Sequence, residues 1–187
     1  MPKPFDLPHY GNKLPPGMVD KIPHDKASAI KIYGDPEKYL KRFADRPHER
    51  WEQDILKSFN LPEPLPYVIG GVTIKRIRLH EKIWRFAASA FQDVVEADLW
   101  DLMAPWAGSY NWRLRAGLAN LSTHAWGIAF DINPAENPLG KRGDKATGIL
   151  AETDRGKRLV KLLERWGWYW GGHWERPDAM HFQFGNW

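Results

Sequence analysis

Ser122-Thr-His-Ala-Trp-Gly-Ile-Ala-Phe-Asp-Ile-Asn133 is the stretch of sequence that best predicts the fold. In an extended strand, successive side chains point to opposite faces. One face would carry three large apolar residues, Ile128, Phe130 and Ile132. The other would carry two very small residues and a carboxylate, Gly127, Ala129 and Asp131. The pattern predicts a strand that packs into a core and leaves space beside Asp131, with His124 just before the strand.

The end of the chain shows the same alternation. Phe182 and Phe184 alternate with His181 and Gln183, which predicts a second strand with phenylalanines in the core. His181 and Gln183 would then face a site, and Asp178 would lie at the mouth of that strand.

These residues suggest a metal site. Zinc hydrolases commonly use three protein ligands and keep a fourth position for water. His124, Asp131 and His181 form such a set. The chain has no cysteine, so its ligands must come from His, Asp or Glu. Asp178 is left as the general base, with Glu175 as a less favoured alternative.

Composition sets further bounds. The 187 residues predict one domain with an arm, and 43% hydrophobic residues suffice for an ordinary core. We expect no membrane insertion, since no apolar run approaches about 20 residues. The first residues carry no apolar signal segment, which predicts cytoplasmic synthesis. A net charge of +4 and a pI of about 9.2 favour anionic partners such as nucleic acid or wall polymer.

The N-terminal third is predicted to be an arm with short helices. Residues 1–35 are proline-rich, and we expect them to wrap the domain or to stay partly mobile. Two helices are predicted, over Pro36–Arg46 and Pro47–Phe59. The cluster Leu61–Pro66 should break regular structure, which divides the chain into an arm (1–66) and a catalytic domain (67–187).

The catalytic domain shows several further elements. We expect strands over 67–79, a helix over Glu81–Asp98, a loop over Asn133–Gly148 and a helix over Asp154–Trp166. A strand over Gly108–Gly117 would place Arg113 and Arg115 on one face, where either could hold a substrate carboxylate or carbonyl. Ser122 could cap a turn or hydrogen-bond within the site.

Two motifs resemble a known family. Ser-x-His-x-x-Gly-x-Ala-x-Asp over Ser122–Asp131 and Trp-x-x-x-Asp-x-x-His-Phe over Trp174–Phe182 resemble the M15, or VanY-like, zinc peptidases of the D-Ala-D-Ala carboxypeptidase type. The resemblance, which covers about residues 67–187, implies a Zn²⁺ ion on His124, Asp131 and His181, with Asp178 as base.

The family also implies a small α+β fold, like that of Hedgehog and D-Ala-D-Ala peptidases, in which helices pack on a central antiparallel sheet. An upstream arginine contacts substrate in the family, and we slightly favour Arg113 over Arg115. The substrate would be the peptidoglycan stem peptide rather than nucleic acid, and the protein a monomer. Four residues are predicted to contact it: Ser122, Arg115, Trp174 and Gln183.

The aspartate at position 178 distinguishes between groups of enzymes within the family. Carboxypeptidases usually have glutamate there, whereas this chain resembles the L-alanyl-D-glutamate endopeptidases of phage endolysins. We therefore expect cleavage of the L-Ala-D-Glu bond after release to the wall or as a phage-encoded protein. A D,D- or L,D-carboxypeptidase is the alternative. A non-catalytic wall-binding module is more remote, as is a non-haem iron oxygenase, whose first His and carboxylate usually lie one residue apart.

Overall fold

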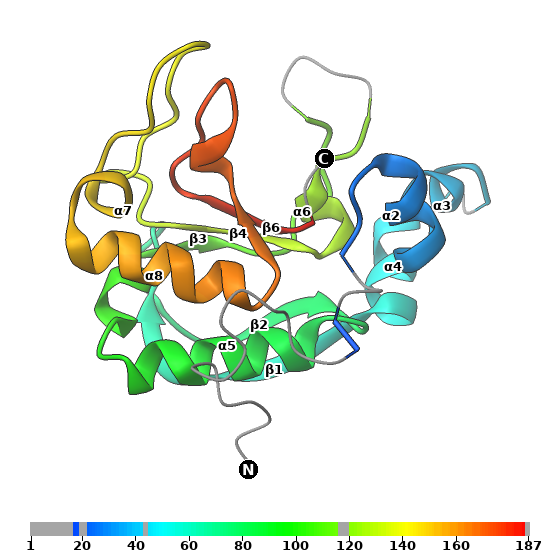
Figure 1. Ribbon diagram of the computed structural model, residues 1–187. Helices are drawn as coiled ribbons and strands as arrows, with labels where there is room; N and C mark the ends of the chain where they lie inside the picture. Colours follow the sequence, from blue (N-terminus) through cyan, green and yellow to red (C-terminus); the bar gives the residue numbers. More distant parts are fainter. Residues whose placement is uncertain (1–16, 19–21, 43–44, 116–119, 186–187) are drawn as a thin grey trace.

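The computed structural model describes residues 17–18, 22–42, 45–115 and 120–185 (Figure 1). In chain order the elements are α2 (Lys26–Tyr33), α3 (Pro36–Arg42), α4 (Pro47–Ile55), β1 (Leu56–Pro66), β2 (Thr73–His80), α5 (Trp84–Glu96), the 3-10 helix η2 (Trp100–Met103), β3 (Trp106–Gly108), α6 (Thr123–Trp126), β4 (Ala129–Ile132), α7 (Ile149–Glu152), α8 (Asp154–Arg165), β5 (Trp168–Trp170), the 3-10 helix η3 (Gly171–His173) and β6 (His181–Phe184). The predicted α+β class is confirmed.

A four-stranded antiparallel sheet, in the order β3-β4-β6-β5, lies at the centre of the molecule. Phe130 of β4 is fully buried, and its ring stacks on those of Trp106 and Phe182 at centroid distances of 5.2 and 5.3 Å. Phe91 of α5 approaches the same ring edge-on at 5.5 Å. The apolar face predicted from the alternation therefore lies in the core, as expected for aromatic side chains of this size.

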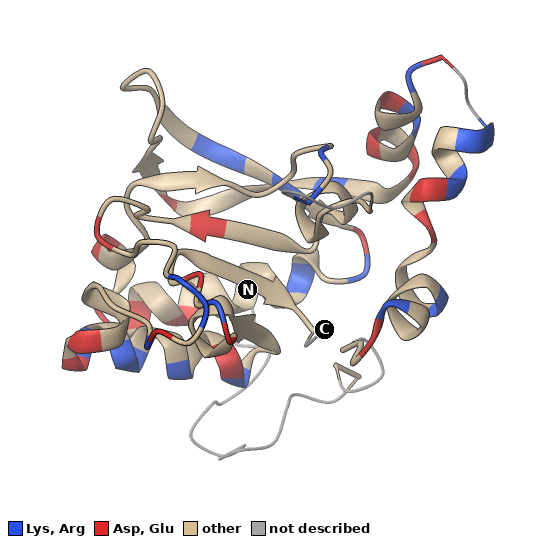
Figure 2. Ribbon diagram, turned by 90° about the horizontal axis from the view of Figure 1, so that it is seen from above, with Lys and Arg blue, Asp and Glu red and all other residues tan. Residues whose placement is uncertain are grey.

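Two helices cover one side of this sheet. α5 contacts β1 and α8, and α8 contacts β5. The charged residues of α8 are mostly basic, with Asp154 at its start and Glu164 near its end (Figure 2), as expected for a helix with only one buried stripe. Three segments, within 109–115, 133–148 and 171–180, rise on the opposite side of the sheet (Figure 1). They surround the ends of the strands that carry the candidate ligands.

The predicted break in regular structure at Leu61–Pro66 is wrong. β1 continues through Pro66 and pairs antiparallel with β2 from Leu56 opposite His80. The register shifts between Asn60 and Leu65, where the prolines lack the N–H that a regular ladder needs. The division of the chain into 1–66 and 67–187 stays a prediction. β1, which lies before this boundary, pairs with β2, which lies after it, so the two parts share one hairpin.

The N-terminal arm packs on the domain where the structure describes it. Asp25 caps α2 by accepting a hydrogen bond from the Ser28 N–H at 2.6 Å. Met18, Ala29 and Tyr33 are buried in the main core. These residues of the arm therefore pack against the domain, whereas residues 1–16 and 19–21 lie outside the described part of the chain. The helix α2 was not predicted from the sequence.

Several predicted boundaries need correction. The helix expected over Pro47–Phe59 ends at Ile55, because the following residues pair with β2. The helix expected over Pro36–Arg46 is described over Pro36–Arg42, and residues 43–44 lie outside the described part of the chain. The helix expected over Glu81–Asp98 covers Trp84–Glu96, and the last helix nearly matches its prediction, since α8 spans Asp154–Arg165. The predicted strand over Gly108–Gly117 is wrong for its described residues: β3 ends at Gly108, and in 109–115 an isolated bridge from Leu114 to Leu121 is the one strand-like pairing, while 116–117 lie outside the description.

His80 ties the arm to the hairpin and makes folding sensitive to pH. Its buried ring bonds through Nε2 to the Tyr33 carbonyl at 2.9 Å and accepts through Nδ1 from the Lys82 N–H at 3.1 Å. Both bonds suit the neutral ring. Burial lowers the pKa of His80 to about 4, although the Tyr33 carbonyl opposes the shift.

We expect the stability of the metal-free protein to fall as the pH drops from about 6.5 to about 4. In this window the unfolded chain binds a proton at His80 and the folded chain does not, so protonation favours unfolding. The loss attributable to His80 is on the order of 3 kcal/mol. Urea unfolding at several pH values would measure it. His80→Gln keeps a donor and an acceptor without titrating, so an unchanged pH slope in that variant would contradict the assignment.

Candidate metal centre

Three elements bring the predicted ligands together. His124 lies on α6, Asp131 on β4 and His181 on β6, where Asp131 and His181 are direct cross-strand partners. Directly opposed residues on neighbouring strands have adjacent side chains. Ser122–Asn133 was predicted to be extended, but a helical turn precedes β4. Gly127 ends this turn with φ of 72°, a left-handed conformation that favours glycine, and a Cβ there would also push the Leu56 side chain aside.

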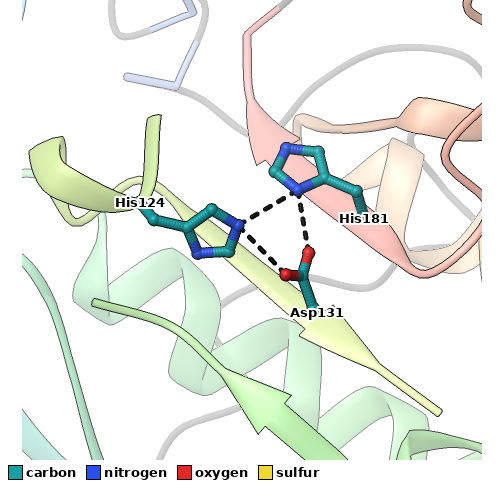
Figure 3. A group of neighbouring side chains, drawn as sticks. All are labelled: His124, Asp131 and His181. Carbon is teal, nitrogen blue, oxygen red and sulfur yellow. Dashed lines mark hydrogen bonds and ion pairs between the residues drawn. The ribbon is translucent and has the colours of Figure 1, made fainter. Parts of the chain in front are cut away.

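The candidate ligand atoms are spaced as a small cation requires (Figure 3). The site-facing ring nitrogens, His124 Nε2 and His181 Nδ1, are 3.2 Å apart. His124 Nε2 lies 3.3 Å from Asp131 Oδ2, and His181 Nδ1 lies 2.8 Å from Asp131 Oδ1. Ligands about 2.0–2.1 Å from a tetrahedral zinc ion are about 3.3 Å apart. The three side chains therefore form a group that could hold a metal ion.

Hydrogen bonds on the far side of each ring fix its orientation. His124 Nδ1 lies 2.7 Å from the carbonyl of Ser109, so this nitrogen carries the proton and donates. His181 Nε2 lies 3.3 Å from Gln183 Oε1, and the Gln183 amide nitrogen donates to the Gly185 carbonyl at 3.1 Å. Both neutral rings then turn a lone pair toward the site. Such partners are typical of metal-binding histidines.

The resulting donor set fits a divalent cation. With only the far-side nitrogens protonated, two imidazole lone pairs and one carboxylate would converge with no proton donor between them, an arrangement that a positive charge stabilises. In the metal-free site, burial favours neutral Asp131, but hydrogen bonds and attraction from His124 and His181 outweigh it and hold the pKa of Asp131 well below its usual range. A bound cation would replace the protons that these hydrogen bonds require. Asp131 is thus ionised and able to act as a ligand.

Asp178 lies beside this group without joining it. Its backbone is held by two hydrogen bonds, Asp178 N–H to the Gly171 carbonyl at 3.0 Å and His181 N–H to the Asp178 carbonyl at 3.1 Å. Among the described residues, its Oδ1 is one of the buried polar atoms without a hydrogen-bond partner. Burial raises the pKa of Asp178, and repulsion from Asp131 adds to this effect. A desolvated carboxylate with a raised pKa is suited to accept a proton.

The two arginines differ in their relation to this carboxylate. Both Arg113 and Arg115 are exposed. The positive charge of Arg113 acts on Asp178 and lowers its pKa, against the larger effect of burial. The Arg113 carbonyl accepts from the Ser122 N–H at 2.9 Å, so the residue is tied to the start of α6. These contacts favour Arg113 as the arginine that faces the site.

The remaining predicted contacts have different surroundings. Ser122 is the N-cap of α6, and its hydroxyl accepts from the His124 N–H at 3.3 Å, the capping alternative of the sequence analysis. Gln183 is only 2% exposed and bonds to His181, which favours an orienting role over substrate contact. The half-exposed Trp174 ring lies 5.2 Å from the His181 ring and remains open to a ligand.

A family comparison agrees with this geometry. Residues 116–184, less than half of the chain, match the family model described as D-alanyl-D-alanine carboxypeptidase. This match supports an M15 family peptidase. No curated protein and no solved structure matches the chain. Within the described residues, no helix has the length and apolar character needed to span a bilayer.

Ser109 is a residue of the site that was not predicted from the sequence. Its contribution is a backbone carbonyl, which any residue type provides, so no side-chain pattern could have marked it. The hydrogen bond that His181 donates to Gln183 was indicated weakly, because residues two apart on a strand share a face. The alternation that suggested a site-facing Gln183 therefore located the residue without giving its role.

Proposed function

We propose that the protein is a zinc-dependent peptidoglycan peptidase that hydrolyses the L-Ala-D-Glu bond of the stem peptide. The observation that carries the proposal is the convergence of His124, Asp131 and His181 beside the desolvated carboxylate of Asp178. The match of residues 116–184 to the peptidase family model supports peptide-bond hydrolysis as the reaction class. The protein would act on the cell wall after its release from the cytoplasm.

The chemistry divides between cation and protein. A zinc ion held by the three ligands would supply a Lewis acid that polarises an amide carbonyl and acidifies water. Asp178, outside the ligand set, would take the proton from the attacking water and pass it to the leaving amine. Its burial makes the carboxylate a stronger base for the first transfer, since burial raises its pKa.

Arg113 would bind the substrate. Its exposed guanidinium can donate two parallel hydrogen bonds to a carboxylate or bind the oxyanion that develops on the scissile carbonyl. Stem peptides carry carboxylates near each amide bond, which suits the positive charge. Trp174, whose ring is tilted against that of His181, would form an apolar wall beside the reacting group.

A D,D- or L,D-carboxypeptidase is the second candidate. The description of the matched family model, D-alanyl-D-alanine carboxypeptidase, favours it directly. The aspartate at position 178 favours the endopeptidase, because this residue distinguishes the two groups in the resemblance given above. The two reactions release different products and are therefore easily separated.

Digestion of purified peptidoglycan decides between these functions. We expect mass spectrometry to show stem peptides with a new D-Glu amino terminus and no free D-alanine. Release of D-alanine without new internal termini would select the carboxypeptidase. A chelator should abolish cleavage and added zinc restore it. Activity that survives full metal removal, or iron content with oxygen uptake, would overturn the proposal.

A further inference from the structure

The segment Ser109–Arg113, here called the bridging segment, lies between the N-terminal arm and the candidate metal centre. Two of its residues bond to His124 through their backbones. The Ser109 carbonyl accepts from His124 Nδ1 at 2.7 Å, and the Asn111 N–H donates to the His124 carbonyl at 3.3 Å. One side of the bridging segment therefore fixes both the ring and the backbone of a candidate ligand.

Tyr110 and Trp112 of the bridging segment reach toward α4 in the arm. The Tyr110 hydroxyl donates to the His48 carbonyl at 3.4 Å. The Trp112 ring lies 6.5 Å from the ring of Trp51, which is fully buried. Trp51 also contacts the rings of Tyr39 and His80 at 5.0 and 6.1 Å. α4 is thus anchored in the protein interior and offers a rigid support.

Arg78 of β2 completes the connection. Its guanidinium lies 5.6 Å from the centre of the Tyr110 ring, a cation-π distance, and forms an ion pair with Glu52 of α4. The Arg78 carbonyl accepts from the Ser109 hydroxyl at 3.0 Å. Glu52 therefore holds Arg78, and Arg78 contacts both Tyr110 and Ser109.

We propose that Glu52, Arg78 and Tyr110 are positioning residues through which α4 of the arm fixes the metal centre and the direction of Arg113. The inference rests on the proposed function for its effect on catalysis, but its effect on metal binding can be measured separately. Groups that orient a histidine ligand affect metal affinity strongly, because they set the ring before the cation arrives. The arm would then be part of the catalytic unit rather than a detachable module.

Two matched substitutions on α4 test the proposal. Glu52→Gln removes the charge that holds Arg78, whereas Glu49→Gln, one turn away, removes only the exposed pair with Arg46 at 3.2 Å. Zinc is titrated into the metal-free full chain in competition with a chromogenic chelator. We expect about threefold to tenfold weaker binding for Glu52→Gln and no change for Glu49→Gln. In wall digestion, kcat should fall more than KM rises.

Tyr110 variants give a second measurement. Tyr110→Ala should weaken zinc binding about tenfold, and Tyr110→Phe should restore most of it, since the ring over Arg78 remains. Thermal unfolding monitors the fold, and Glu52→Gln decides the matter if Tyr110→Ala unfolds. Wild-type zinc affinity in both Glu52→Gln and folded Tyr110→Ala would overturn the inference. If the variants change zinc affinity as expected but the wild-type protein does not cleave purified wall, the proposed function is wrong and the inference about the positioning residues stands.

Discussion

Replacing His181 with alanine is expected to abolish metal binding and to lower kcat/KM for wall cleavage at least about a thousandfold. The variant keeps only His124 and Asp131, and the closest of the three contacts, 2.8 Å to Asp131, is lost with the ring. Loss of an outer-sphere partner already costs about 10–100-fold in metal affinity, and loss of a ligand costs more. Metal content by atomic emission and cleavage of purified wall measure the two effects.

His173→Ala is the matched control for this variant. His173 precedes the same strand, but it is exposed and pairs with Glu164 at 2.6 Å rather than with the candidate ligands. We expect wild-type metal content and activity from it. A His181→Ala protein that remains folded and retains one zinc ion would show that the ligand set is wrong.

Replacing Asp178 with asparagine is expected to lower kcat by about a hundredfold to ten-thousandfold while leaving zinc affinity nearly unchanged. The amide has the shape of the carboxyl group but cannot accept the proton. Substrate contacts stay in place, so KM should change little. Because the buried Oδ1 has no hydrogen-bond partner among the described residues, loss of its charge should not lower the melting temperature.

Glu175→Gln serves as the comparison for Asp178. Glu175 is exposed, pairs with Arg142 at 3.3 Å and was the competing candidate for the base. We expect full turnover from this variant. If Glu175→Gln loses turnover and Asp178→Asn retains it, the general base is Glu175 and not Asp178.

The alternating patterns predicted the strands well and the segments between them poorly. Ile128, Phe130 and Phe182 are buried where the pattern placed them, because a period of two has one structural meaning in a sheet. Prolines were read as the end of regular structure at Leu61–Pro66, but β1 accommodates them with a register shift. The strand expected after Gly108 failed because its residues bond to α6 and the arm rather than to a neighbouring strand.

The sequence by itself determined which side chains could form the site: a histidine just before one strand, an aspartate within that strand and a histidine on a second strand, with a further aspartate near by. Residue type and local spacing suffice for that. Only the tertiary structure decided which ring nitrogens face inward, through Ser109 and Gln183, and joined α4 to the bridging segment. These contacts depend on backbone groups or link residues far apart in the chain, so they leave no periodic trace in the sequence.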